Sequence, residues 1–162
     1  MGNQEIIDSC VDQCTTELFA AYGVELGASG RDHTADIGYA AVIGFTGESL
    51  RGTLLLAPAR SIVERSQASA GISDRDWVGE LANQLLGRIK NALLRYGAEI
   101  FVTTPLVLRG EHIAPSPRGG LKPHVFDGVS VWFDADIING VELVEGAGGD
   151  DVAAAEGEAF LF

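Results

Sequence analysis

Residues 74–96 read DRDWVGELANQLLGRIKNALLRY, and their apolar side chains recur at spacings of three and four. This period predicts an amphipathic α-helix, because about 3.6 residues complete each turn. Ser73 is a suitable N-cap, and Asp76 lies near the positive end of the helix dipole. We expect the apolar side of this helix to face the core: Val78, Leu81, Ala82, Leu85, Leu86, Ile89, Ala92, Leu93 and Tyr96.

The opposite side of this helix has an unusual composition: Asp76, Glu80, Asn83, Gln84, Gly87, Arg88, Asn91 and Arg95. Solvated helix faces usually carry Glu, Lys, Gln and Ala, whereas Gly costs about 1 kcal/mol relative to Ala. Glu80 and Asn83 are neighbours at i and i+3, and Gly87 lies one turn further on, where another surface can approach the backbone. Two interpretations stay open: an ordinary solvated face, or a docking face that offers a carboxylate and a carboxamide.

A carboxamide cannot act as a general base, but it can orient a water molecule by donating one hydrogen bond and accepting another. Phosphoryl transfer depends mainly on positioning and charge neutralisation. An amide such as that of Asn83 is therefore sufficient if a metal ion and a cation come from elsewhere. The sequence shows no metal-ligand spacing, so we expect no cofactor on this chain and a partner that supplies the metal.

The rest of the chain predicts two further helices and a set of strands. The helices are expected over residues 4–22 and 59–69. The strands are expected over 36–47 and 50–57 as a hairpin, over 98–109 with an interruption at Pro105, and around 129–133 (VSVWF) and 141–145 (VELVE) with a turn at Asn139-Gly140. Loops are expected over 27–35 and 114–124.

Length and charge limit the classes of function. The 162 residues fit one domain, which we place at 1–144, followed by an acidic, flexible tail over 145–162 that ends in Phe160-Leu161-Phe162. The net charge of −12 argues against binding to nucleic acid or to an anionic membrane surface. No apolar run is long enough to span a bilayer, and no secretory signal is visible, so we expect a cytoplasmic protein.

The cysteines and histidines, which often serve as catalytic residues or metal ligands, form no recognisable motif in this sequence. Cys10 and Cys14 are either a metal or redox pair or two small buried residues, and the second interpretation is favoured. His33, His112 and His124 have no ligand spacing. Phosphate-binding glycine motifs and a GxSxG nucleophile elbow are missing from the sequence.

Three segments together resemble a known family. They are AVIGFTGESLRGTLLLAPARSIVERSQ, DRDWVGELANQLLGRIKNALLRYG and AEIFVTTPLVLRGEHI, and they resemble the CheC/CheX/FliY family of chemotaxis phosphatases, with CheX closest in layout. The family signature has an acid or serine, three intervening residues, a Glu, two intervening residues, an Asn, and later a proline. Here it reads Asp76-WVG-Glu80-LA-Asn83, followed by Gly87 and Pro105, with Gln84 where an apolar residue such as Met is common.

The resemblance implies an α+β fold, a two-layer sandwich whose largely antiparallel sheet packs against long helices. It implies hydrolysis of the phospho-aspartate on a CheY-type response regulator that carries the Mg²⁺. By carry-over, Glu80 would anchor the regulator's active-site lysine and Asn83 would orient the attacking water, with Asp76, Gln84, Gly87 and Asn91 as further partner-binding residues. It also implies a homodimer. The open alternative is a non-catalytic module that recognises receiver domains or a signalling or flagellar assembly.

An internal similarity links two parts of the chain. LFAAYGVEL at 18–26 and LLRYGAEIF at 93–101 both pass from a helix through Tyr-Gly into an apolar segment. Duplication and chance explain this about equally well. Alignment of the two Tyr-Gly ends sets Ile6 and Ser9 opposite Glu80 and Asn83, so we expect one site per chain.

Overall fold

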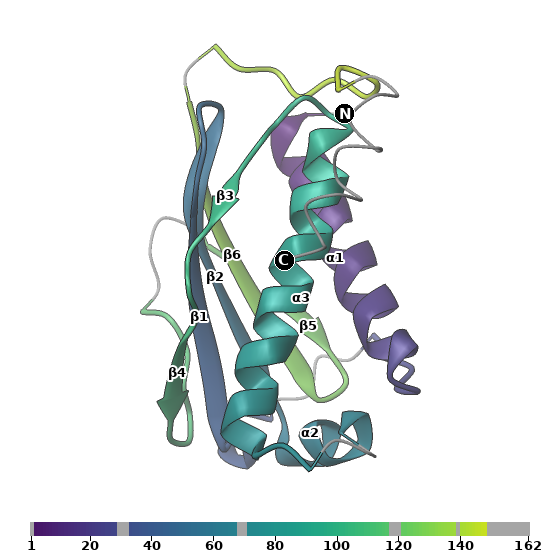
Figure 1. Cartoon of the computed structure of the whole chain (residues 1–162), viewed down its shortest axis with the longest axis vertical. Helices are drawn as coiled ribbons and strands as arrows, with labels where there is room; N and C mark the ends of the chain where they lie inside the picture. The colour runs from purple at the N-terminus through teal and green to yellow at the C-terminus, as the bar shows by residue number, and fades with distance from the viewer. Residues whose placement is uncertain (1, 29–32, 68–70, 117–120, 139, 149–162) are drawn as a thin grey trace.

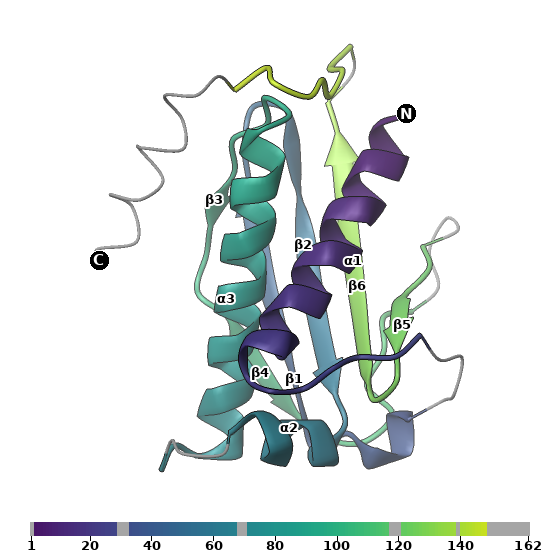
Figure 2. The ribbon, with the colours of Figure 1, turned by 90° about the vertical axis from the view of Figure 1, so that its right-hand side faces the viewer.

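The computed structural model, which describes residues 2–28, 33–67, 71–116, 121–138 and 140–148, has two layers (Figure 1). Helices α1 (Asn3–Ala21) and α3 (Asp74–Leu94) lie side by side on one face of a sheet, and the short α2 (Arg60–Ser66) lies across one end (Figures 1 and 2). A 3₁₀ helix, Thr34–Asp36, precedes the sheet. The predicted α+β two-layer fold is confirmed.

The sheet is antiparallel throughout its described strands. They are β1 (Tyr39–Thr46), β2 (Leu50–Pro58), β3 (Phe101–Val102), β4 (Leu106–Arg109), β5 (His124–Phe126) and β6 (Val129–Ile137). Their order is β3-β1-β2-β6-β5, and β4 also pairs with β1 beyond β3. Ile43 of β1 lies opposite Leu54 of β2, which lies opposite Phe133 of β6, so these three side chains share one face.

The core lies between this face and the two long helices. Every apolar residue predicted to face the core from α3 is buried, except that Tyr96, just past the helix, is half-buried. Strands β1 and β2 send alternate residues to the core and to a smaller apolar cluster on the other face, which explains the unbroken run Leu54–Ala57. Gly52 fits beneath the Phe45 ring, since an added Cβ would lie 2.9 Å from Phe45 Cζ and 1.9 Å from the Asp134 carbonyl oxygen.

One predicted strand is wrong. Residues 141–144, in the predicted VELVE strand, are not extended in a sheet, because the Asn3 side chain takes their backbone groups: its Nδ2 donates to Val141 O at 2.9 Å and its Oδ1 accepts from Leu143 N at 2.9 Å. β6 instead pairs with β5 through a two-residue turn at Asp127-Gly128, where Gly128 has φ 87°. Asn139 of the predicted turn lies outside the described residues.

The predicted interruption at Pro105 is confirmed, since it separates β3 from β4. Thr103 bridges the gap: its backbone N–H and its hydroxyl both donate to Gly44 O, and its hydroxyl oxygen accepts from Gly44 N. The segment therefore stays attached to β1 across the interruption.

The two long helices end in the same way. The N–H of Gly23 donates to Ala20 O and that of Val24 to Phe19 O, and the N–H groups of Gly97 and Ala98 repeat this pattern on Leu94 and Leu93. Gly23 and Gly97 both have positive φ, at 78° and 86°, as this type of helix end requires. The segment after α1 then bridges to β5 at Ala28↔Phe126, and the segment after α3 pairs with β1. Helix α1 therefore leads to the edge of the sheet beside the β5–β6 hairpin, and helix α3 leads to the opposite edge, beside the β1–β2 hairpin.

The beginning of the predicted acidic tail contacts the domain. Gly146 N–H donates to Arg95 O at 2.8 Å, and Val144 N–H donates to Tyr96 O at 3.3 Å. These bonds hold residues 144–146 against the end of α3. Residues 149–162, including Phe160-Leu161-Phe162, lie outside the described part of the chain.

Candidate functional site

The predicted site lies along α3, from Asp76 near its start to Asn91 near its end. Ser73 caps the helix, because its hydroxyl accepts from Asp76 N at 3.2 Å. Asp76 is exposed, and Arg75 Nε donates to its Oδ1 at 3.1 Å. Hydrogen bonds from the Arg75 and Ser73 side chains, together with the charge of Arg75, hold the pKa of the Asp76 carboxyl below its usual value.

Asn83 and Glu80 are both exposed and lie one turn apart on the side of α3 that faces away from the core. The side chain of Asn83 forms no hydrogen bond with any residue that the structure describes. Both its donor and its acceptor are therefore available to an external molecule.

Glu80 is restrained by its neighbours. Gln84 Nε2 donates to Glu80 Oε1 at 3.0 Å, and the Gln84 Oε1 accepts from the Tyr22 hydroxyl at 2.7 Å. Tyr22 lies just beyond the end of α1 and packs edge-on against Trp77 of α3, with ring centroids 4.9 Å apart. Trp77 Nε1 in turn donates to Ser66 Oγ of α2 at 2.9 Å. Three helices thus meet behind the Glu80 carboxylate.

The remaining predicted partner-binding residues continue along α3. Gly87 lies one turn beyond Asn83, Asn91 follows one turn later, and both are half-buried. Gln84 is also half-buried, but both ends of its amide are engaged inside the chain. Asn83 is therefore an exposed member of the predicted site whose whole side-chain amide is unbonded among the described residues.

Strand β4 and the preceding Pro105 pack against the buried side of α3, behind the exposed face that carries the site. Gly79 is buried, and a Cβ added there would lie 3.2 Å from Val107 Cγ2 and 4.0 Å from Pro105 Cγ. The proline of the signature therefore packs beneath the turn that precedes Glu80. Three large apolar side chains of the same edge are exposed, Phe101 at 58%, Leu106 at 63% and Leu108 at 37%. Lys90 Nζ of α3 lies 5.8 Å from the Phe101 ring centroid.

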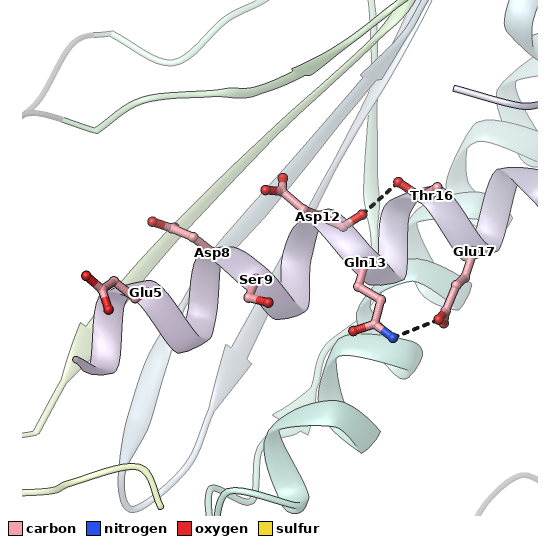
Figure 3. A pocket seen from close by; sticks show the side chains of 7 residues that line it. All are labelled: Glu5, Asp8, Ser9, Asp12, Gln13, Thr16 and Glu17. Atoms are coloured by element: carbon pink, nitrogen blue, oxygen red, sulfur yellow. Dashed lines mark hydrogen bonds between the residues drawn. The ribbon is translucent and has the colours of Figure 1, made fainter. Parts of the chain in front are cut away.

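The outward face of α1 differs in chemistry. It borders an open depression of about 760 Å³ and carries mainly carboxylates and short polar groups (Figure 3): Glu5, Asp8, Ser9, Asp12, Gln13, Thr16 and Glu17. His124 of β5 contacts Asp12 Oδ1 at 2.7 Å through Nδ1, and its Nε2 lies 3.5 Å from Asp8 Oδ1. Ser9 is exposed, but Ile6 is 5% exposed and belongs to the core. The aligned positions of α1 therefore offer no carboxylate–carboxamide pair.

The cysteines are core residues, as the favoured interpretation predicted. Cys10 and Cys14 are unpaired thiols buried in the main core cluster. Burial raises the pKa of both, and that of Cys14 to about 12, so neither is a thiolate near neutral pH. Within the described ranges, no three His, Cys, Asp or Glu residues are grouped as a metal ion would require.

A second hollow lies on the sheet face that points away from the helices. It measures about 380 Å³ and is mostly apolar, with Leu55, Ile113 and Trp132 among its walls. None of the predicted site residues lines it. No described helix is long and apolar enough to cross a membrane.

With the geometry of α3 established, comparison with known proteins places the chain in a family. The family model for chemotaxis phosphatase CheX matches residues 39–127, which is more than half of the chain and includes all of α3. The chain belongs to the CheX family. No curated protein sequence matches it.

Solved structures share the fold of this CheX-family protein at low sequence identity. A CheC-like superfamily protein from Shewanella sp. PV-4 is 19% identical, with a TM-score of 0.63 over 80% of this chain and 97% of that one. Chemotaxis protein CheX from Vibrio vulnificus is 16% identical, with a TM-score of 0.63 over 79% and 95%. CheX from Borrelia burgdorferi, solved as a complex with CheY, BeF₃ and Mg²⁺, is 15% identical, with a TM-score of 0.55 over 81% and 96%. The family resemblance predicted from the sequence is confirmed.

Sequence reasoning named Gln84 but missed Tyr22, its hydrogen-bond partner behind the candidate site. Tyr22 and Gln84 are separated by 62 positions, so no local pattern connects them. Sequence reasoning also missed Gly79, which, unlike Gly87, lies on the buried side of α3. The sequence did contain a signal for it, because a glycine among large apolar residues of a helix indicates that another element packs closely against the backbone.

Proposed function

We propose that this protein accelerates hydrolysis of the phospho-aspartate on a CheY-type response regulator, with Asn83 orienting the attacking water and Glu80 anchoring the regulator. The observation that carries the proposal is the unbonded carboxamide of Asn83, exposed on α3 one turn from the Glu80 carboxylate. The CheX family match and the CheX–CheY complex from Borrelia burgdorferi support a CheY-type partner.

The chemistry assigned to Asn83 is positioning. Its carbonyl oxygen can accept from a water molecule while its amide donates to the phosphoryl group or to the water's lone pair, which restricts the water to one approach. Holding a nucleophile in line with the bond that breaks lowers the barrier without any proton transfer to the amide. Mg²⁺ comes with the receiver in this proposal, where it neutralises phosphoryl charge, and this chain needs no metal of its own.

Glu80 supplies affinity rather than chemistry. Its Oε2 is not hydrogen-bonded to any described residue, so the carboxylate can pair with a cation such as the active-site lysine of a receiver. Asp76, Gln84, Gly87 and Asn91 extend the same helix face on either side, and we propose that they complete the docking face, Gln84 through its hydrogen bond to Glu80.

The test is the lifetime of phosphorylated CheY-like receiver domains with and without this protein. The wild-type protein should shorten the lifetime of at least one receiver. Asn83→Ala should reduce the maximal rate by about 10²-fold or more with its thermal unfolding unchanged, because the side chain is exposed. Glu80→Ala should instead raise the receiver concentration needed for half-maximal rate.

Ser9→Ala is the matched control, because Ser9 is exposed at the aligned position of α1 and should leave the rate unchanged. Full activity of Asn83→Ala would remove Asn83 from the mechanism. Binding to a phosphorylated receiver without a shortened lifetime would select the alternative, a non-catalytic recognition module.

The implied homodimer concerns a separate surface. One edge of the sheet is covered, since Gly27 O accepts from Asp127 N beside β5, whereas the other edge presents β3 and β4 with exposed Phe101 and Leu106. We propose that this second edge joins two copies, and that the protein acts in the cytoplasm with its receiver. Sedimentation of Leu106→Lys should show monomers where the wild-type protein shows dimers.

A further inference from the structure

The hydrogen-bonded chain from α1 to the docking carboxylate has a fixed direction. The Glu80 carboxylate can only accept, so the Gln84 group facing it must be the NH₂, and the Gln84 oxygen must face Tyr22. The Tyr22 hydroxyl then donates to that oxygen at 2.7 Å. The opposite amide orientation would set the Gln84 oxygen against the carboxylate. Each group in the chain therefore determines the orientation of the next.

The far end of this chain is anchored in the fold. Tyr22 directly precedes Gly23, whose positive φ and Ala20 hydrogen bond end α1, so its backbone is fixed. Its ring packs edge-on against Trp77, which is 7% exposed and hydrogen-bonded to Ser66. Glu80, by contrast, is an exposed side chain with three rotatable bonds and no ion pair among the described residues. The hydrogen bonds through Gln84 thus connect the fixed Tyr22 to the Glu80 carboxylate, which would otherwise be mobile.

We propose that Gln84 and Tyr22 are positioning residues for Glu80, which hold its carboxylate in the docking orientation before the regulator arrives. The inference rests on the proposed function and refines it: Gln84 contributes to docking through Glu80. A carboxylate that is already ordered loses less conformational entropy on binding, so its contact with a cation gives a higher affinity. The water that Asn83 orients is not touched by this chain, so the maximal rate should not depend on it.

Two substitutions interrupt the chain at different points. Gln84→Leu removes both hydrogen bonds at similar volume, and Tyr22→Phe removes the hydroxyl while keeping the ring against Trp77. With the receiver that responds to the wild-type protein, Gln84→Leu should raise the half-saturating receiver concentration by about three- to tenfold with an unchanged maximal rate. Tyr22→Phe should give a smaller rise in the same direction.

Helix α1 provides a matched control. Gln13 Nε2 donates to Glu17 Oε1 at 2.9 Å, so the same kind of Gln–Glu pair at i and i+4 exists away from α3 (Figure 3). Gln13→Leu should leave both kinetic constants unchanged. The decisive comparison is the double variant Glu80→Ala with Gln84→Leu: without Glu80, the second substitution should have no further effect.

A measurement on the free protein separates this inference from the proposed function. In NMR spectra, the side-chain amide signals of Gln84 should shift in Tyr22→Phe and in Glu80→Ala, but not in Gln13→Leu. Unchanged Gln84 amide signals in these two variants would contradict the hydrogen bonds from Tyr22 through Gln84 to Glu80. So would an unchanged half-saturating concentration in Gln84→Leu, or a Gln84→Leu penalty that persists in full without Glu80. If the wild-type protein shortens no receiver's lifetime, the proposed function fails, and the amide signals still report whether the chain exists.

Discussion

Gly79 lies where α3 packs closely against Val107 of β4, and replacing it tests whether this packing positions the helix that carries the candidate site. An added Cβ would lie 3.2 Å from Val107 Cγ2, which is shorter than the 3.5–4.0 Å of an optimal carbon contact. Alanine fits if Val107 moves by a few tenths of an ångström, and it gains about 1 kcal/mol of helix propensity. We therefore expect Gly79→Ala to be close to neutral.

Valine at the same position should be clearly destabilising. It adds two methyl groups where the first added carbon already touches Val107, and overpacking of this kind costs about 1–3 kcal/mol. For a chain of this size, that loss should lower the melting temperature by about 3–10 °C. Removing two methyl groups from half-buried Val107 costs about 1 kcal/mol by itself.

The double variant distinguishes crowding from other causes. If Gly79 is needed for space, Val107→Ala makes room, and Gly79→Val with Val107→Ala should cost about as much as Val107→Ala alone. Urea unfolding of the four proteins, with equal m values, measures the coupling, which we expect to be at least about 1 kcal/mol. Additive losses would refute the packing argument, because the cost of valine would then arise within α3 itself.

Three further outcomes follow from burial and charge. Cys10 and Cys14 should react with a thiol reagent at pH 8 far more slowly in the folded protein than in urea, since burial raises the pKa of the Cys14 thiol to about 12. Asp76→Asn should lower the urea midpoint at pH 7: the folded pKa of Asp76 is below its ordinary 3.8, so its stabilisation is present above that value and disappears as the pH falls through the folded pKa. The two midpoints should converge in acid. Leu85→Ala, at a fully buried position, should cost about 2–5 kcal/mol in unfolding free energy.

The elements that the sequence predicted well are those with a local signal. The α3 helix combines a Ser73 cap, a 3.6-residue apolar period and a Tyr-Gly end, and it spans Asp74–Leu94 against a prediction of 74–96. The interruption at Pro105 was equally local, because proline cannot donate to a strand partner. The exposure of Glu80 and Asn83 follows from the same helical period.

What the sequence could not predict depends on contacts between distant residues. VELVE has the alternation of a strand, yet the Asn3 side chain, from the other end of the chain, binds its backbone groups. The hydrogen bond between Tyr22 and Gln84 needs the crossing of α1 and α3, which no local pattern specifies. The turn at Asp127-Gly128 had a local signal, but Asn139-Gly140 offered a competing one of the same kind.

The asymmetry between α1 and α3 follows from charge as well as from residue identity. Both helices end in the same Tyr-Gly motif and cover the same sheet face, but the outward face of α1 carries Glu5, Asp8, Asp12 and Glu17, and α1 itself contains no Lys or Arg. A phosphoryl group is anionic, so this face repels the substrate that the proposed reaction requires. Helix α3 has two carboxylates at its site, Asp76 and Glu80, and these are followed by Arg88 and Lys90 in the helix and by Arg95 at its end. On a chain with a net charge of −12, α3 is therefore the helix that an anionic phosphoryl group can approach.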